Sequence, residues 1–292
     1  MIPHSKFLLF RFVFMAVGLS TFAVMPVRSA EFLLQNTSFA GYSTGQLTTD
    51  GTGTNSGKGG WLTFTDSITG AADFNVVANP DSGATHGNVL AIAAPNVATG
   101  TYSAAWNPEV STNMASNPSG NDYFVTTYDF YMGGASSTST NLYGVAMYDS
   151  TYNILASAYV QNDTGQLYIG GYSLSNGVND NWLYNTTDIV QRNSWNSIRI
   201  AFNKLTGRFE AGIIGSQDNW SVVGAATGSE LFEVDLEALA WGGTAAQGAT
   251  TGYFDNVRIV SQTVPVPEPS TYAMCIIGAM VLGGLARRKN AA

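Results

Sequence analysis

The sequence has 292 residues, with 12 lysines and arginines against 20 aspartates and glutamates, which gives a net charge of -8. Binding to a phosphate backbone requires a basic surface, so this balance argues against a nucleic-acid partner. With 45% hydrophobic and 12% aromatic residues, the chain can bury a core, which excludes a disordered protein. Residues 31–264 hold six of the cations and nineteen of the carboxylates, whereas both ends of the chain are basic.

Residues 1–30 have the pattern of a secretory signal peptide. Basic residues precede an apolar run over 12–25, and the small residues Ser29 and Ala30 offer a cleavage site. An uncleaved anchor helix is the alternative, but the run is shorter than the ~20 apolar residues that span a bilayer. The sequence therefore predicts an N-terminal signal helix and export of the chain.

Residues 264–292 combine a proline-rich segment, a short apolar run and a basic end. The prolines keep residues 264–271 out of a helix, which makes them an extended stalk. We expect a short transmembrane helix over 272–286, and the cations after it should hold that end in the cytoplasm by the positive-inside rule. Both ends thus agree in placing residues 31–263 outside the inner membrane.

The order of these C-terminal segments resembles the bacterial PEP-CTERM sorting signal. The residues that carry the resemblance are Pro267, Glu268 and Pro269 together with Arg287, Arg288 and Lys289. The resemblance implies an exosortase-type membrane enzyme as a partner, which would cut near the Pro-Glu-Pro triplet. It also implies an inner-membrane-tethered precursor that is passed to the cell surface or the extracellular matrix. A plain C-terminal anchor helix is the alternative.

Residues 31–263 predict one all-β domain. Short runs rich in aromatic and β-branched residues alternate with turn residues, for example over 122–131 and 141–148. The segments 162–165 and 204–207 end in glycine between two such runs and predict hairpins. No long amphipathic helix is apparent, so we expect two packed antiparallel sheets.

The strand segments also resemble those of concanavalin A-like jelly-roll sandwiches. The resembling pieces are residues 59–61, 86–92, 195–200 and 254–259. This resemblance implies a two-sheet jelly-roll fold. Because such sandwiches serve as lectins, binding modules, glycanases and adhesins alike, the fold implies no activity by itself.

The predicted domain is poor in two residue types that often carry catalysis. The only cysteine, Cys275, lies in the predicted sorting helix, which removes disulfides and thiolate chemistry from the domain. His86 is the only histidine after residue 30, so a zinc site with several histidines cannot form. We expect His86 to be a hydrogen-bonded turn residue.

Three carboxylates alternate with apolar residues near the end of the domain. In a strand, Glu233, Asp235 and Glu237 would share one face. Their spacing resembles that of the lichenase-like β-glucanases, which implies a retaining hydrolase with Glu233 as nucleophile, Asp235 as helper and Glu237 as acid/base. The residues that follow lack the continuation expected of that family. We therefore expect the solvated acidic face of a plain strand in a protein without catalytic activity.

Asp255 is the candidate metal ligand. It would face inward on the closing strand, where a buried carboxylate needs a partner. The jelly-roll resemblance implies that such an aspartate can hold structural Ca²⁺ together with carbonyl oxygens of the opening strand. A carboxylate that accepts hydrogen bonds from turn amides is the alternative.

Aromatic rings beside amides suit sugar binding, since rings stack on the apolar face of a pyranose. The densest example is the predicted loop 179–185, which contains Trp182 and Tyr184, and the second is 218–220, which contains Trp220. We therefore expect a structural or carbohydrate-binding protein with extracellular polysaccharide as a partner. Glycan hydrolysis by the three carboxylates is the alternative.

Overall fold

The computed structural model describes residues 30–66, 73–83, 85–94, 101–133, 139–175, 178–216, 220–223, 226–241 and 250–263. The predicted signal peptide and sorting tail lie outside these described residues. Within the described part, no helix is both long and apolar enough to cross a membrane.

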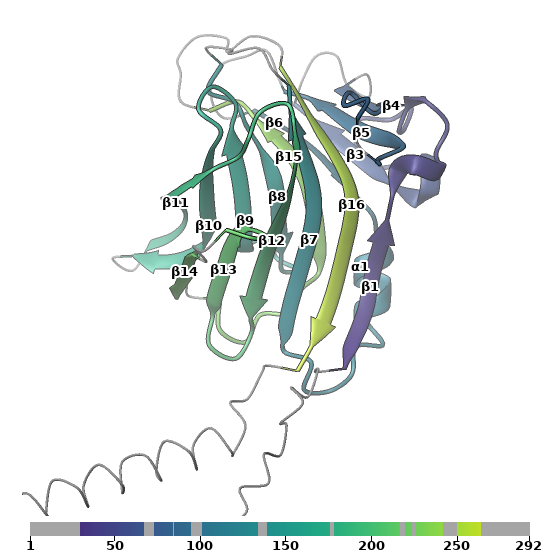
Figure 1. The fold of residues 1–292 in the computed structure, drawn as a ribbon. Coiled ribbons are helices and arrows are strands. Elements are labelled where there is room, and N and C mark those ends of the chain that lie inside the picture. Colours follow the sequence, from purple (N-terminus) through teal and green to yellow (C-terminus); the bar gives the residue numbers. More distant parts are fainter. Residues whose placement is uncertain are drawn as a thin grey trace, which may run out of the picture.

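Two antiparallel sheets pack face to face (Figure 1). The nine-stranded sheet consists, in spatial order, of β14 (Trp220–Val223), β13 (Arg208–Ile213), β12 (Trp195–Asn203), β7 (Tyr123–Met132), β16 (Thr251–Gln262), β5 (Asn88–Ala93), β4 (Phe74–Ala78) and β2 (Gly45–Gln46), with β1 (Glu31–Thr37) paired to β16. The seven-stranded sheet consists of β11 (Val178–Ile189), β10 (Gln166–Ser175), β9 (Ile154–Gln161), β8 (Leu142–Tyr148), β15 (Glu233–Leu239), β6 (Tyr102–Trp106) and β3 (Leu62–Thr65). The short helices are η1 (Phe39–Gly41), η2 (Lys58–Gly60) and α1 (Glu109–Met114). The expected all-β, two-sheet, jelly-roll-like sandwich is confirmed.

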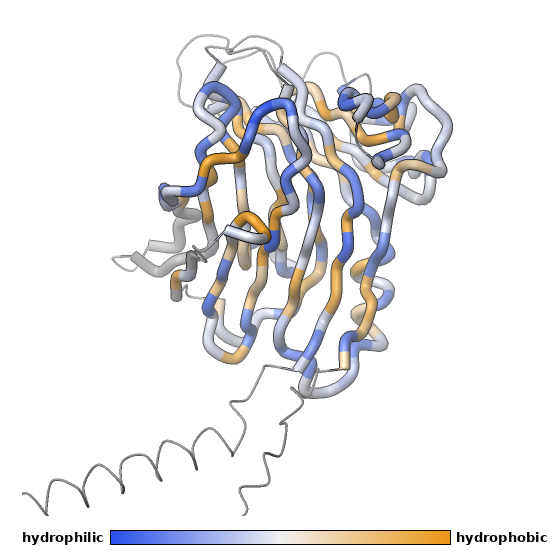
Figure 2. Tube along the Cα trace, viewed as in Figure 1, coloured by the Kyte–Doolittle hydropathy of each residue, from blue (hydrophilic) through white to orange (hydrophobic). Residues whose placement is uncertain are grey.

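The core lies between the sheets and follows from alternation along the strands. The core contains three fully buried residues of β12, Ile198, Ile200 and Phe202. Ser197, which precedes Ile198 and faces the other way, is exposed. Figure 2 shows the same alternation of hydrophobic and hydrophilic residues along the strands of the nine-stranded sheet. One face of each strand thus meets the other sheet, and the opposite face is free to carry function.

Both predicted hairpins are present. Residues 162–165 join β9 to β10, and residues 204–207 join β12 to β13. Gly165 has a φ of 74° and Gly207 a φ of 67°, in the left-handed region that glycine adopts without steric cost.

The prediction of a loop over 179–185 is wrong. These residues belong to β11, which pairs with β10 over most of its length. Polar residues suggested a loop, but β11 lies at the edge of its sheet, where one side stays in water and polar residues are tolerated.

The two ends of the described domain lie together. Glu31 at the start of β1 is paired with Gln262 at the end of β16. The segments that precede and follow the domain therefore attach at the same end of the sandwich (Figure 1).

Candidate functional site

The three carboxylates of β15 lie on the outer face of the seven-stranded sheet. Val234 and Leu236, which alternate with them, belong to the core between the sheets. Because side chains alternate along a strand, Glu233, Asp235 and Glu237 face away from the other sheet.

The expectation of a solvated acidic face is wrong. Asp235 is only 7% exposed and Glu237 only 2%, while Glu233 at the start of β15 is half-buried. The reason is the position of β15, which lies inside the sheet between β8 and β6 rather than at its edge. Aromatic side chains from the flanking strands cover the carboxylates, and the sequence of β15 alone does not reveal them.

The strand register explains how these aromatic side chains reach Glu237. Its neighbours across β8 and β6 are the small residues Gly144 and Ala104. A Cβ at Gly144 would lie 1.9 Å from the carbonyl oxygen of Ala158, so only glycine fits there. Tyr159 of β9 is paired with Gly144 of β8. Because Gly144 has no side chain, the Tyr159 side chain can extend across β8 to Glu237.

Two tyrosine hydroxyls bind the Glu237 carboxylate. The Tyr159 hydroxyl donates to Oε2 at 2.5 Å, and the Tyr148 hydroxyl donates to Oε1 at 2.6 Å. Both oxygens of Glu237 therefore have a donor of their own, and the side chain is fixed in one orientation.

The carboxylates lie in a long hollow that we call the furrow. It consists of two adjoining cavities of about 420 and 230 Å³, which share Tyr102, Tyr148 and Ile154 in their walls. The furrow is lined by Phe64, Thr101, Tyr102, Ala104, Trp106, Tyr148, Tyr152, Ile154, Tyr159, Glu233, Asp235, Glu237, Leu239, Ala240 and Trp241. Of the four most exposed aromatic rings of the described residues, Tyr102, Tyr152 and Trp241 lie here.

Burial is the main cause that raises the pKa of all three carboxyl groups. It raises the pKa of Glu233 to about 7, opposed by a hydrogen bond with Asp235. The pKa of Asp235 is raised well above its usual range by burial and by the charges of Glu233 and Glu237. The pKa of Glu237 is also raised by burial, although the two tyrosine hydroxyls lower it. Burial therefore favours the neutral form of each of the three carboxyl groups.

Two polar atoms of furrow residues, Thr101 Oγ1 and Asp235 Oδ1, lack a hydrogen-bond partner within the described residues. Asp235 Oδ1 is buried and accepts no hydrogen bond from them. The furrow places the carboxyl groups of Glu233 and Asp235 beside the exposed ring of Tyr102. The furrow can thus offer a hydrogen-bond acceptor between aromatic walls.

The aromatic residues predicted for ligand binding are not part of the furrow. Tyr184 is 38% exposed, but its ring lies 6.4 Å from that of the core residue Phe209, so it stands on the opposite face of its sheet. Trp182 lies in β11 and Trp220 begins β14, and the side chains of both fall outside the described residues.

Asp255 joins the closing strand to the turn that follows the opening strand. Its Oδ1 accepts hydrogen bonds from the Phe39 amide at 3.0 Å and from the Ser38 hydroxyl at 3.2 Å. The sequence analysis gave two alternatives for Asp255, a calcium ion and hydrogen bonds from turn amides. The hydrogen bond from the Phe39 amide agrees with the second. Among the described residues, no three His, Cys, Asp or Glu side chains are grouped so that they could hold a metal ion. Calcium at Asp255 stays a prediction.

His86 is hydrogen-bonded, as expected. Its Nε2 lies 3.0 Å from Asp129 Oδ2, and its ring stacks on Trp195 with 4.0 Å between centroids. The Ser197 hydroxyl also donates to Asp129. Because the carboxylate lies between the histidine and the serine, the imidazole does not activate the hydroxyl as in a serine hydrolase.

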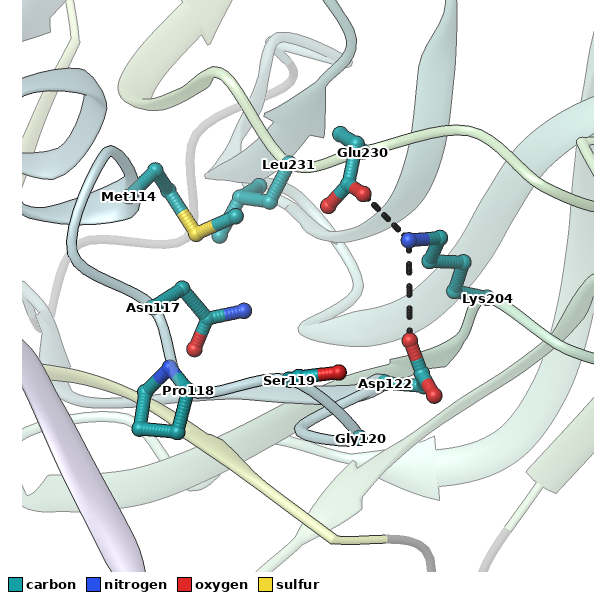
Figure 3. Close-up of a pocket in the computed structure, with 9 residues that line it drawn as sticks. All are labelled: Met114, Asn117, Pro118, Ser119, Gly120, Asp122, Lys204, Glu230 and Leu231. Carbon is teal, nitrogen blue, oxygen red and sulfur yellow. Dashed lines mark hydrogen bonds and ion pairs between the residues drawn. The ribbon is translucent and has the colours of Figure 1, made fainter.

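A third cavity, of about 420 Å³, lies beside the β12–β13 hairpin (Figure 3). Its single cation, Lys204, forms ion pairs with Glu230 and, at 3.5 Å, with Asp122. The ammonium group is already neutralised by two carboxylates, so this cavity offers a ligand little charge.

The aromatic residues of the furrow were missed because those that reach β15 come from three other strands, β6, β8 and β9. Tyr102, Trp106, Tyr148 and Tyr159 are brought to β15 only by the order and register of the sheet. The available signal was the outward position of Tyr148 and Tyr159 in the segments 142–148 and 154–161, which could have been combined with the outward acids of β15.

Comparison with family models and with curated proteins finds no match for the chain. Solved structures of similar fold include an alginate lyase from Chlorella virus, with 13% identity and a TM-score of 0.46 over 70% of this chain and 93% of that one. An endo-β-1,4-glucuronan lyase from the fungus Trichoderma reesei has 12% identity and a TM-score of 0.47, covering 82% and 98%. The CBM2 module of the evolved Dit protein of a Lactobacillus casei phage has 11% identity and a TM-score of 0.45, covering 82% and 100%. At such identities these likenesses concern the fold alone.

Proposed function

We propose that this protein binds an extracellular polysaccharide in the furrow and does not cleave it. The observation that carries the proposal is the half-buried Glu233 carboxyl group in a hollow walled by Tyr102, Trp106 and Tyr148. A pyranose presents apolar C–H faces to rings and hydroxyl donors at its edge, which fits both features.

The charge of the furrow favours an uncharged glycan. Its described lining includes three carboxyl groups and neither lysine nor arginine. A polyuronate would find no cation there to pair with its carboxylates. Neutral hydroxyls can instead donate to the carboxyl oxygens.

Hydrolysis is the second candidate, and one contact favours it. The hydrogen bond between Asp235 and Glu233 is the one expected of a helper and a nucleophile. Two features oppose it. Glu237, the implied acid/base, is 2% exposed and has both oxygens bonded to tyrosines. A Glu233 pKa of about 7 leaves about half of the implied nucleophile protonated near neutrality.

Binding is tested by retardation of the purified protein in native gels that contain an uncharged β-glucan, with alginate as the charged control. Tyr102→Ala should weaken retardation about fivefold, the effect of one lost aromatic contact. The matched control is Tyr184→Ala, because both tyrosines are 38% exposed and only Tyr102 lines the furrow. Equal retardation of both variants and the parent protein would refute the furrow as the site.

Catalysis is tested by reducing-sugar release from the same β-glucan. We expect none from the parent protein. Release that disappears in Glu233→Gln would make the protein a glycanase.

We further infer that the protein is exported and sorted to the cell surface or the matrix through residues 264–292. The support is the sequence pattern, in which the Pro-Glu-Pro triplet at 267–269 precedes an apolar run and a basic cluster. Replacing Arg287, Arg288 and Lys289 by alanine should leave unprocessed precursor in the membrane fraction. Processing identical to that of the parent protein would contradict a role for this cluster.

A further inference from the structure

A row of aromatic residues crosses the outer face of the nine-stranded sheet. Trp195 of β12 is paired with Tyr131 of β7, which is paired with Tyr253 of β16. The ring centroids lie 5.5 Å and 5.9 Å apart along this row. The chain neighbours Phe130 and Phe254 are buried in the core, so the row faces away from the furrow, on the opposite side of the sandwich.

The row continues into a hollow on the next two strands, β5 and β4. Ala91 of β5 is paired with Tyr253, and Asn75 of β4 is paired with Ala91. Because the alanine side chain is small, a cavity of about 410 Å³ remains, with Ala91 and Ala93 as its floor and Tyr253 and Asn75 at its sides. An aromatic wall, a small floor and a nearby amide are features that a sugar ring can use.

The far end of the row is held in place by polar contacts. The His86 ring stacks on Trp195, and the Trp195 Nε1–H donates to Asn79 Oδ1 at 3.2 Å. Asp129 binds His86 and accepts a hydrogen bond from Asn256 at 2.7 Å. Rings that are fixed before a ligand arrives lose little conformational entropy on binding.

We propose that this row and hollow form a second site for an uncharged polysaccharide. The described lining of the hollow again contains a carboxylate, Asp73, and neither lysine nor arginine, which disfavours a polyanion. With the furrow on the opposite face, one molecule would hold two polysaccharide chains and cross-link them. The cross-linking part rests on the proposed function of the furrow, whereas the second site does not.

The place of the row in the fold suits a tethered protein. Gln262, the last residue of β16, lies nine positions after Tyr253. At ~3.3 Å per strand residue this is about 30 Å. The row therefore lies at the end of the sandwich away from the point where the tail begins, and a tether there leaves it accessible.

The test compares three variants of the purified protein with the parent in β-glucan gels and in the turbidity of a dilute β-glucan solution. Tyr253→Ala removes the aromatic wall, and Ala93→Phe fills the hollow without removing any ring of the row. Tyr102→Ala reports on the furrow. Circular dichroism melting checks that each variant is folded. Because Tyr253→Ala removes a side chain from the hollow and Ala93→Phe adds one, a folding defect in one variant leaves the other informative.

Tyr253→Ala and Ala93→Phe should each lower retardation about fivefold and abolish turbidity, while the furrow still binds. If β-glucan retards the Tyr253→Ala and Ala93→Phe variants as strongly as the parent protein, and both variants cause the same turbidity, the second site is overturned. Loss in these two variants with an unchanged Tyr102→Ala would instead refute the furrow and with it cross-linking. A parent protein that no β-glucan retards contradicts both sites. A dimer that Tyr253→Ala dissociates would show that the row binds a second copy of the chain and not a glycan.

Discussion

At the scale of single residues, Glu237 depends on two tyrosine hydroxyls. Tyr159→Phe leaves one buried carboxylate oxygen without its donor, and hydrogen bonds to charged groups contribute about 1.5–3 kcal/mol. We expect urea unfolding at pH 8 to show a loss in this range. The loss should shrink at pH 5, because the hydroxyl stabilises the ionised form. Tyr168→Phe is the matched control, since its hydroxyl donates to the neutral Gln161 side chain. Equal losses at both pH values would contradict an ionised Glu237.

Glu233 makes stability depend on pH. Burial raises its pKa from 4.5 to about 7, so between these values the folded state binds a proton more tightly than the unfolded state does. The free energy of unfolding should therefore fall as pH rises from 5 to 8. Glu233→Gln should reduce that fall by about 1–2 kcal/mol, after allowance for solvent screening of a half-buried group. Glu31→Gln, an exposed carboxyl of the other sheet, serves as control and should leave the fall unchanged.

At the scale of elements, Asp255 ties β16 to η1. Asp255→Ala should cost about 2–3 kcal/mol in the free energy of unfolding, because the Phe39 amide and the Ser38 hydroxyl lose their shared acceptor. If calcium adds to this junction as the sequence predicts, a chelator should lower the melting temperature of the parent protein by several degrees. A melting temperature that the chelator does not change would remove calcium and leave only the hydrogen bonds.

Local elements were predictable from sequence, and their pairing was not. The turns at 162–165 and 204–207 contain their own signals, and the alternation of Glu233, Asp235 and Glu237 places them on one face whatever surrounds them. The contact between Tyr159 and Glu237 joins residues 78 positions apart and depends on the order of strands in the sheet. The error over 179–185 has the same origin, because an edge strand is recognised by its neighbours rather than by its residues.

At the scale of the whole molecule, recognition is expected to rest on rings and hydroxyl acceptors rather than on ion pairs. Only 11% of the residues are charged, and the furrow and the hollow contain carboxyl groups without described cations. Raising NaCl from about 50 to about 500 mM should therefore change the affinity for an uncharged β-glucan by less than about twofold. A steep loss of affinity with salt would indicate a charged ligand and contradict this account.

The location of the glycan in the furrow is tested most directly by hydroxyl-radical footprinting with and without β-glucan, read out by mass spectrometry. Tyr102, Trp241 and Tyr184 are each 38% exposed, but only the first two line the furrow. We predict that the glycan slows oxidation of Tyr102 and Trp241 severalfold and leaves Tyr184 unchanged. Protection of Tyr184 with no change at Tyr102 and Trp241 would contradict a glycan site in the furrow.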